Sequence, residues 1–365
     1  MTLDIGFLGY RFMGKAHANA LARLPMFFPD APATNRDVLI GRSEAAVSDA
    51  ADRFGFDRTA SDWRDVVDEV DVFYNLGPNH VHAEPTIAAL ESDVHVMCEK
   101  PLAPDIETAT EMRDTARESN AVAATGFNYR YVPAIQLAKR LVNEGELGEI
   151  HRVKGRCLQD WLADPNLPWN WRCDADVSGT GVVGDVGSHT IDLVRWIIGD
   201  IESLSGSLVT QVTERPDPDG DGTRPVTTDD EYSALVEFEN GVEGVLEGSR
   251  IATGRKADNA IEIYGSEGAL KFSLRRLNEL QVKGSDDRGY QQILVTDDDD
   301  PYMDRWWPAG HIIGWEHTFV HENYEFLTAI RDGEQYRPSF EDGVDVQRVV
   351  EGIRESDERG ERVYV

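Results

Sequence analysis

The chain has 365 residues, and 67 Asp and Glu against 36 Lys and Arg give it a formal net charge of −31. Such a surface repels phosphate groups, so the composition excludes nucleic acid and anionic membranes as partners. Eight Trp, 13 Phe and 11 Tyr exclude a disordered chain, because they supply enough apolar surface for a sizeable core. The length favours two domains over one.

The first third of the chain alternates short apolar runs with stretches of helical periodicity. The expected strands are residues 3–8, 38–40, 70–75, 94–98 and 121–125, and the expected helices are 9–24, 43–54, 83–91 and 106–118. Strand, helix and strand at this spacing predict βαβ units and a parallel sheet. We therefore expect a doubly wound, dinucleotide-binding domain over residues 1–127.

Beyond residue 127 the pattern becomes rich in strands. A helix at 133–144 precedes expected strands at 151–158, 204–212, 233–238, 242–249, 260–264 and 269–272, with further helices at 185–198, 317–331 and 343–357. Glu239-Asn240-Gly241 is a turn signal between two of these strands. The pattern predicts an α+β domain over residues 128–365, with a large, mostly antiparallel sheet that has an open face.

A glycine-rich turn follows the first expected strand. Gly9 and Gly14 match the first and third glycines of a dinucleotide fingerprint, which allow a tight turn and close packing of helix on strand. The middle glycine, which admits the pyrophosphate, is replaced by Arg11. The Arg11 side chain either neutralises the phosphates or points into solvent. Its position in the chain favours a cofactor turn over a generic one.

The end of the second expected strand bears on the choice between NAD and NADP. It reads Ile40-Gly41-Arg42-Ser43, without the carboxylate that binds the ribose hydroxyls of NAD. Arg42 and Ser43 therefore favour a 2′-phosphate slightly. In the alternative reading, Ser43 caps the next helix and Arg42 stacks on adenine.

Two further motifs carry chemistry. Glu99-Lys100-Pro101 ends the fourth expected strand, where open α/β sheets bind ligands, and Lys100 is suited to donate to a substrate hydroxyl. Asp185 and His189 are four apart on an expected helix and therefore share a face. A His beside a carboxylate suits acid–base catalysis near neutral pH, although such a pair is also common as a purely structural contact.

Other features limit the protein's setting. Only seven of its 36 basic residues are Lys, which predicts adaptation to high salt; the alternative is an ordinary acidic protein. Neither a signal peptide nor an apolar run of membrane-spanning length is found, so we expect a soluble, cytoplasmic protein. Its three scattered cysteines favour neither disulfides nor zinc. His317 and His321 lack a third ligand, so we expect packing there and no metal.

Taken in order, these motifs resemble those of the glucose–fructose oxidoreductase/inositol dehydrogenase (Gfo/Idh/MocA) family, over essentially the whole chain. The Thr125–Arg130 run and the closing Phe340-Glu341-Asp342-Gly343 belong to the same resemblance. The segments at 158–161 and 168–172 look like the branch that holds levoglucosan and scyllo-inositol dehydrogenases. Arg11 in the fingerprint and the run Leu76-Gly77-Pro78-Asn79 depart from the family pattern.

The resemblance implies a set of roles. Lys100, Asp185 and His189 are the implied catalytic residues, with His189 as the base for a ring hydroxyl. The implied cofactor contacts are Gly9, Tyr10, Arg11, Phe12, Met13, Gly41, Arg42, Ser43, Leu76, Pro78, Asn79, His82, Glu99, Lys100 and Asn128. The implied substrate contacts are Asn128, Trp161, Arg172, Asp185 and His189. The branch commonly uses NAD, which opposes the inference from Arg42, so NAD and NADP both stay open.

We therefore expect an NAD(P)-dependent dehydrogenase that oxidises a ring hydroxyl of a sugar, anhydrosugar or cyclic polyol. One alternative is internal redox chemistry with tightly held NAD, and another is a regulator that binds cofactor without turnover; a metal-dependent hydrolase is the weakest. The open sheet face is expected to form a homodimer or homotetramer, because an exposed antiparallel face needs cover.

Overall fold

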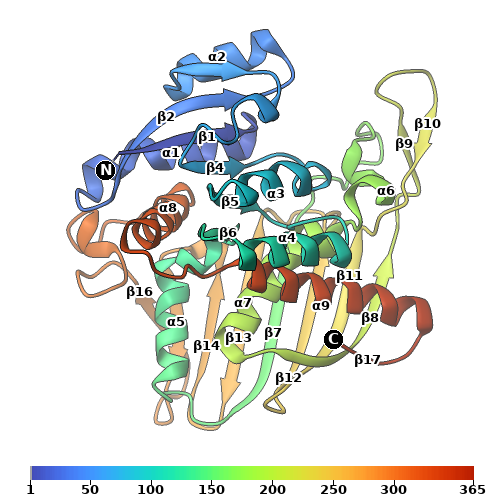
Figure 1. Cartoon of the computed structure of the whole chain (residues 1–365). Helices are drawn as coiled ribbons and strands as arrows, with labels where there is room; N and C mark the ends of the chain where they lie inside the picture. Colours follow the sequence, from blue (N-terminus) through green and yellow to red (C-terminus); the bar gives the residue numbers. More distant parts are fainter. Residues whose placement is uncertain (1) are drawn as a thin grey trace. The chain divides into compact units, whose positions relative to one another are not determined.

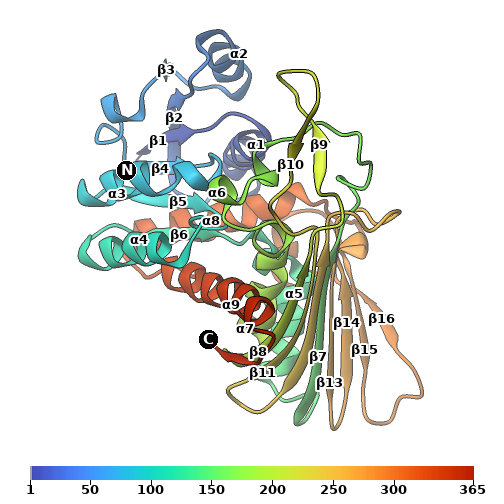
Figure 2. The same ribbon diagram turned by 90° about the vertical axis from the view of Figure 1, so that its right-hand side faces the viewer.

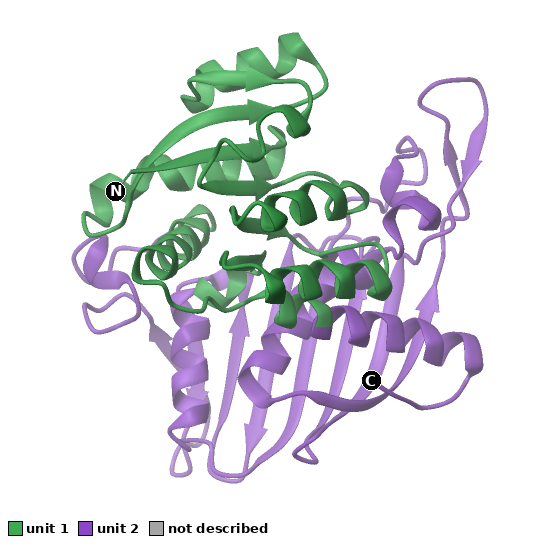
Figure 3. Ribbon diagram, viewed as in Figure 1, with its two compact units in different colours: residues 1–131, 314–344 green, residues 132–313, 345–365 purple. Residues whose placement is uncertain are grey.

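The computed structural model describes residues 2–365. Contacts divide the chain into two compact units, residues 1–131 with 314–344 (unit 1) and residues 132–313 with 345–365 (unit 2), shown in Figure 3. This division adds residues 128–131 and 314–344 to the N-terminal part expected from the sequence. Within residues 2–365, no helix has the length and apolar character needed to cross a membrane.

Unit 1 is built on a parallel sheet of six strands in the order β3-β2-β1-β4-β5-β6, so the doubly wound prediction is confirmed (Figure 1). The strands are β1 Thr2–Leu8, β2 Ala33–Ile40, β3 Arg58–Ala60, β4 Val72–Asn75, β5 His95–Glu99 and β6 Ala123–Gly126. Strand order reverses between β1 and β4, and open α/β sheets bind ligands at the carboxyl ends of strands beside such a point. The sequence missed β3, which has only three residues.

The helices of unit 1 follow from helical periodicity and capping. They are α1 Phe12–Phe27, α2 Glu44–Phe54, α3 Ala83–Glu91, α4 Ile106–Glu118 and α8 Glu316–Asp332. Asp105 caps α4 by accepting the Thr108 N–H at 2.8 Å. Helix α8 packs beside α1, although the two are far apart in sequence. Apolar side chains of β2, β4 and β5 form a buried core with those of α3 and α4.

Unit 2 contains a mixed sheet of nine strands in the order β16-β15-β14-β13-β7-β12-β11-β8-β17. Its strands are β7 Ile150–Leu158, β8 Ile201–Val209, β11 Glu231–Phe238, β12 Glu243–Ser249, β13 Asp258–Gly265, β14 Ala269–Ser273, β15 Glu279–Lys283, β16 Gln291–Leu294 and β17 Val363–Tyr364. Pairing of β7 with β12 is parallel and the other pairings are antiparallel, which confirms a mostly antiparallel sheet. A separate ribbon pairs β9 Glu214–Pro216 with β10 Thr223–Pro225.

Helices cover one face of this sheet and leave the other bare (Figure 2). They are α5 Pro133–Asn143, α7 Ser188–Ile198 and α9 Phe340–Arg359, whose residues from 345 onward belong to unit 2. The short helix α6 Ala175–Ser178 contacts the Trp171–Cys173 turn. Burial alternates along β11: Ala234 and Val236 face the helices, whereas Leu235 is 61% exposed on the bare face. The predicted Asn240-Gly241 turn joins β11 to β12, and Gly241 has a φ of 80°.

Candidate active site

The turn between β1 and α1 in unit 1 has the backbone features of an anion-binding site. Gly9 has a φ of 113°, which favours glycine, and a Cβ on Gly14 would lie 2.4 Å from the Gly9 carbonyl oxygen. No acidic residue lies in the first turn of α1. The helix dipole and the first backbone N–H groups of α1 therefore favour a phosphate at this end. The residues fit the pyrophosphate of a dinucleotide.

The end of β2 supplies the neighbouring surface. The Tyr10 ring packs on the Gly41 backbone so closely that a Cβ there would lie 2.3 Å from a ring carbon. Arg42 and Ser43 are exposed, and Ser43 is the N-cap residue of α2. Burial, and then the nearby charge of Arg42, lower the pKa of His80. Arg42 thus follows β2 at an exposed position, and its predicted contact with a cofactor stays a prediction.

His82 lies inside the protein and joins the loops that follow β4 and β5. Its Nε2 is 2.9 Å from the Gly77 carbonyl oxygen, and its Nδ1 is 3.1 Å from the carbonyl oxygens of Pro101 and Leu102. Burial lowers the pKa of His82, although those carbonyl oxygens and Glu99 oppose the shift. The ring therefore fixes two loops; its predicted cofactor contact stays a prediction.

A buried polar chain holds the Glu99-Lys100-Pro101 turn. Glu99 accepts from His17 Nε2 at 3.3 Å and from the Lys100 backbone N–H at 3.2 Å. Asn323 of α8 donates to His17 Nδ1 at 3.1 Å and accepts from the Tyr74 hydroxyl at 2.7 Å. Lys100 itself is half-buried. The chain of contacts fixes Glu99 from both sides, and the Lys100 backbone with it.

The remaining predicted cofactor residues of unit 1 differ in exposure. Phe12 is 67% exposed and stacks on Trp315, with ring centroids 5.4 Å apart. Asn128 is buried, and its side-chain nitrogen donates to Thr318 Oγ1 at 2.8 Å. Pro78 is exposed, whereas Leu76 and Asn79 are buried and Met13 is partly buried. Their contacts with a cofactor stay predictions.

Unit 2 carries the two residues of the predicted acid–base pair, Asp185 and His189, at the start of α7. A π-helical turn, Val183–Gly187, leads into α7, so Asp185 lies on the turn and His189 in the first turn of the α-helix. Both side chains are half-buried. Asp185 Oδ2 is 3.5 Å from Arg172 Nε, and the Arg172 guanidinium lies 4.3 Å from the Trp171 ring centroid. Three of the predicted substrate residues are therefore placed in one part of unit 2, two of them in direct contact.

Trp161, the other substrate residue predicted in unit 2, lies on the segment that follows β7. Main-chain hydrogen bonds tie this segment to the end of β12: Gln159 N–H donates to the Ser249 carbonyl oxygen at 2.8 Å, and Leu162 N–H to that of Arg250 at 3.0 Å. Arg215 is fully buried and donates to the carbonyl oxygens of Leu162 and Asp164. The half-exposed Trp161 is thus carried by a firmly held segment.

Two family models match the chain. Residues 3–127 match an oxidoreductase family described as an NAD-binding Rossmann fold, and residues 135–271 match the GFO/IDH/MocA C-terminal domain. Levoglucosan dehydrogenase of Pseudarthrobacter phenanthrenivorans is 39% identical over 375 residues, covering 97% of this chain and 96% of that protein. The chain belongs to the Gfo/Idh/MocA family of oxidoreductases.

Other Gfo/Idh/MocA relatives agree. Levoglucosan dehydrogenase solved with NADH and levoglucosan has a TM-score of 0.96 at 39% identity, over 100% of both chains. An oxidoreductase domain protein from Kribbella flavida has a TM-score of 0.96 at 41% identity, over 100% of this chain and 99% of that one. Glucose-6-phosphate 3-dehydrogenase of Bacillus subtilis is 26% identical, over 99% and 98% of the two chains. The predicted family, fold class and NAD-binding domain are confirmed.

For this Gfo/Idh/MocA chain, sequence reasoning missed the residues that support the site. Three buried residues bind site segments from far along the chain: His17 contacts Glu99, Asp229 the backbone before Asp185, and Arg250 the Arg172 carbonyl oxygen. Asn323 is buried too and orients His17. None of them lies in a motif that was recognised. A buried polar side chain has no periodic signal of its own, so only the fold could identify them.

Proposed function

We propose that this protein oxidises a ring hydroxyl of an uncharged sugar, anhydrosugar or cyclic polyol and passes the hydride to NAD in the cytoplasm. The observation that carries the proposal is the contact of Arg172 with Asp185, which lies on the turn that leads to half-buried His189. The relative solved with NADH and levoglucosan supports this substrate class. NAD, when bound, supplies the hydride acceptor.

The residues of this chain bind and orient the substrate and move the proton. His189 accepts the proton of the reacting hydroxyl, because an imidazole titrates near neutral pH. Lys100 donates a hydrogen bond to the same oxygen and stabilises the negative charge that develops there. Asp185 accepts from a neighbouring hydroxyl and orients the ring. Trp161 offers an aromatic face to the apolar side of a sugar, and Asn128 is a further proposed contact.

The balance of charge in unit 2 favours an uncharged substrate. Arg172 is paired with Asp185 and stacked on Trp171, so its cation is already matched by a carboxylate. A phosphate would have to compete with Asp185 for that guanidinium, which lowers the affinity for a sugar phosphate. We therefore expect levoglucosan and inositols to be oxidised in preference to glucose 6-phosphate in a substrate panel.

Lys100→Met and His189→Ala test the assigned roles. Each is expected to lower kcat by about 10²–10⁴-fold, the usual contribution of a positioned acid or base. In His189→Ala, whose side chain is not among the implied cofactor contacts, the Kd for NADH, measured by fluorescence titration, should change less than about threefold. His311→Ala, at an exposed histidine of unit 2, is the matched control and should keep full activity. Normal turnover in His189→Ala would overturn the proposal, and purified enzyme that holds NAD without net NADH formation would indicate internal redox chemistry.

A comparison of the two coenzymes tests the surface after β2. Arg42 and Ser43 favour acceptance of NADP beside NAD, because no carboxylate repels the 2′-phosphate at that position. Arg42→Ala is expected to raise the KM for NADP at least tenfold more than the KM for NAD, through loss of a charge-assisted contact. Equal effects on both coenzymes would mean that Arg42 does not bind the 2′-phosphate.

We also propose that the bare face of the unit 2 sheet pairs with a second copy, giving a homodimer or homotetramer. Two of the seven lysines, Lys154 and Lys271, alternate with buried residues on this face, where Glu262 lies 3.7 Å from Lys271. Exposed Leu235 lies there too. Such mixed charge with apolar patches suits self-association. Leu235→Glu should lower the mass measured by light scattering, whereas Met26→Glu, at an exposed residue of unit 1, should not.

A further inference from the structure

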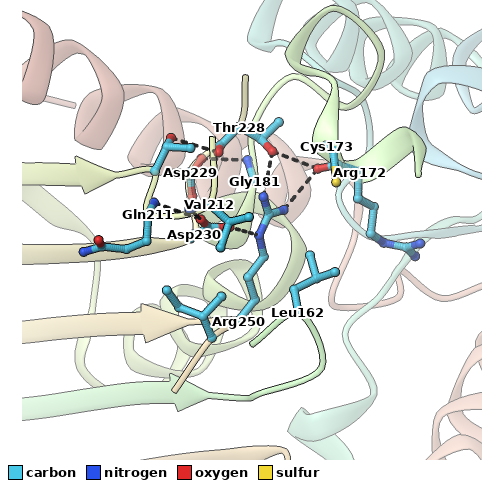
Figure 4. Close-up of polar contacts among 12 residues, drawn as sticks. Leu162, Arg172, Cys173, Gly181, Gln211, Val212, Thr228, Asp229, Asp230 and Arg250 are labelled. Carbon is cyan, nitrogen blue, oxygen red and sulfur yellow. Dashed lines mark hydrogen bonds and ion pairs between the residues drawn. The ribbon is translucent and has the colours of Figure 1, made fainter. Parts of the chain in front are cut away.

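The buried carboxylate of Asp229 accepts hydrogen bonds from the backbone at the start of the turn that carries Asp185 (Figure 4). Asp229 is only 6% exposed. Its two carboxylate oxygens accept the Gly181 N–H at 2.7 Å and the Val183 N–H at 2.9 Å, and its carbonyl oxygen accepts the Val182 N–H at 3.0 Å. Three consecutive backbone N–H groups therefore donate to one residue that is distant in the sequence.

The same backbone reaches Asp185 directly. The Asp185 N–H donates to the Gly181 carbonyl oxygen at 3.0 Å, so the backbone of Gly181 contacts Asp229 on one side and Asp185 on the other. Only glycine fits at that position, because a Cβ would lie 2.0 Å from the Asp229 carbonyl oxygen. The amides held by Asp229 are among the first of the helical stretch that continues into α7, and such unpaired donors favour a carboxylate acceptor.

The neighbours of Asp229 hold the other member of the pair. Arg250 is fully buried and donates to Asp230 Oδ1 at 2.9 Å, to Thr228 Oγ1 at 2.8 Å and to the Arg172 carbonyl oxygen at 3.0 Å (Figure 4). Thr228 also donates to the Arg172 carbonyl oxygen, at 2.9 Å. Residues 228–230 thus anchor the backbone of Arg172 as well as the turn of Asp185.

We infer that Asp229 is a positioning residue for the proposed reaction. It fixes the Gly181–Val183 amides and, through them, the placement of the Asp185 carboxylate relative to His189. The inference rests on the proposed function, because that proposal names the reaction. The positioning role itself is argued from the contacts within unit 2. A misplacement of a catalytic group by about 1 Å can cost about 10²-fold in rate.

Asp229→Asn is the test, with Asp230→Asn as the matched control. Asp230 is equally buried and also accepts two backbone amides, but these belong to Gln211 and Val212, at 2.9 Å each. In Asp229→Asn the new NH₂ group cannot accept, so either the Gly181 or the Val183 amide loses its partner. In Asp230→Asn the NH₂ group takes an acceptor either from the two amides, which share Oδ2, or from Arg250 at Oδ1. Amide hydrogen exchange should accelerate at residues 181–187 in Asp229→Asn and at residues 210–213 in Asp230→Asn.

The kinetic readouts separate positioning from general destabilisation. We expect Asp229→Asn to lower kcat by about 10- to 100-fold at a temperature where it stays folded, and to shift the apparent pKa of the acid limb of kcat/KM. The Kd for NADH should be unchanged within about threefold. Asp230→Asn leaves the Asp229 contacts and the Thr228 contact with the Arg172 carbonyl oxygen in place, so it should lose less kcat than Asp229→Asn and shift the pH profile less. Asp229→Glu keeps the charge but displaces its oxygens, and should give an intermediate loss if Asp229→Asn does not fold.

Two results would overturn the inference. One is unchanged exchange at residues 181–187 in Asp229→Asn. The other is faster exchange there with the kcat and pH profile of the wild type. An active His189→Ala overturns the proposed function and removes the catalytic part of this inference, whereas an inactive His189→Ala beside a fully active Asp229→Asn overturns the positioning role alone.

Discussion

The two units place their site residues by different physical means. In unit 1 the candidate cofactor residues lie at or just after the carboxyl ends of β1, β2, β4, β5 and β6, so a parallel sheet brings local motifs to one edge. In unit 2 Asp185 and Arg172 lie outside the strands and are held by side chains from residues 228–230 and 250. The comparison shows that parallel strand ends bring local motifs to one edge, where buried His17 and His82 then fix them. The residues of unit 2 depend on buried polar partners for their placement itself.

Removal of the buried Arg250 guanidinium is expected to have the largest effect on stability. Arg250→Met leaves the Asp230 carboxylate buried without its cation, which should lower the free energy of unfolding by about 3–5 kcal/mol. Urea denaturation measures the loss. Arg354→Met removes a surface pair with Glu351 and should cost less than about 1 kcal/mol. Similar losses in the two variants would mean that the buried Arg250–Asp230 ion pair stabilises unit 2 no more than a surface pair does.

Acid pH provides a test centred on unit 1. Burial lowers the pKa of His321 to about 3, below the value of about 6.5 for an unfolded chain. The unfolded state therefore takes up the proton first, and stability is lost as the pH falls from 6.5 towards 3. The loss attributable to this group is about 2 kcal/mol at pH 5. His321→Gln should remove that part of the pH dependence, and His311→Ala, at an exposed site, should leave it; equal slopes in all three proteins would contradict the prediction.

Gly14→Ala tests whether the turn of unit 1 depends on close backbone packing. The added Cβ would lie 2.4 Å from the Gly9 carbonyl oxygen and must displace the start of α1. We expect the Kd for NADH to rise about tenfold, equivalent to roughly 1.4 kcal/mol. Gly289→Ala is the matched control, because a Cβ there meets no atom within 4 Å. An unchanged Kd in Gly14→Ala would show that the turn tolerates the shift.

Salt should have the smallest effect and should act on both units. With a net charge of −31, the surface repels itself, and added salt shortens the range of that repulsion from about 10 Å at 0.1 M to about 3 Å at 1 M. We expect the midpoint of thermal unfolding and kcat to rise together between 0.1 M and 2 M KCl. A flat response in both would contradict adaptation to salt and leave the dehydrogenase proposal untouched.

Most of the fold was predictable because its elements are periodic. Helix α4 was expected at residues 106–118, where it is found, and the six main strands of the second domain correspond to β7, β8 and β11 to β14. Short or polar strands were missed, among them β3, β15, β16 and β17, because they lack a recognisable alternation. The packing of α8 with unit 1 was also missed, since a helical period does not say which partner covers its apolar side.

For the candidate site, the sequence by itself determined the local motifs that hold the candidate residues: the Gly9 turn, Glu99-Lys100-Pro101 and the spacing of Asp185 and His189. Only the tertiary structure decided what holds them, with His82 between two loops, His17 and Asn323 behind Glu99, and Asp229 beneath Gly181. The physical reason is the sequence separation of the interacting residues. A motif depends on neighbours in the chain, whereas a buried polar group must find its partner wherever the fold supplies one.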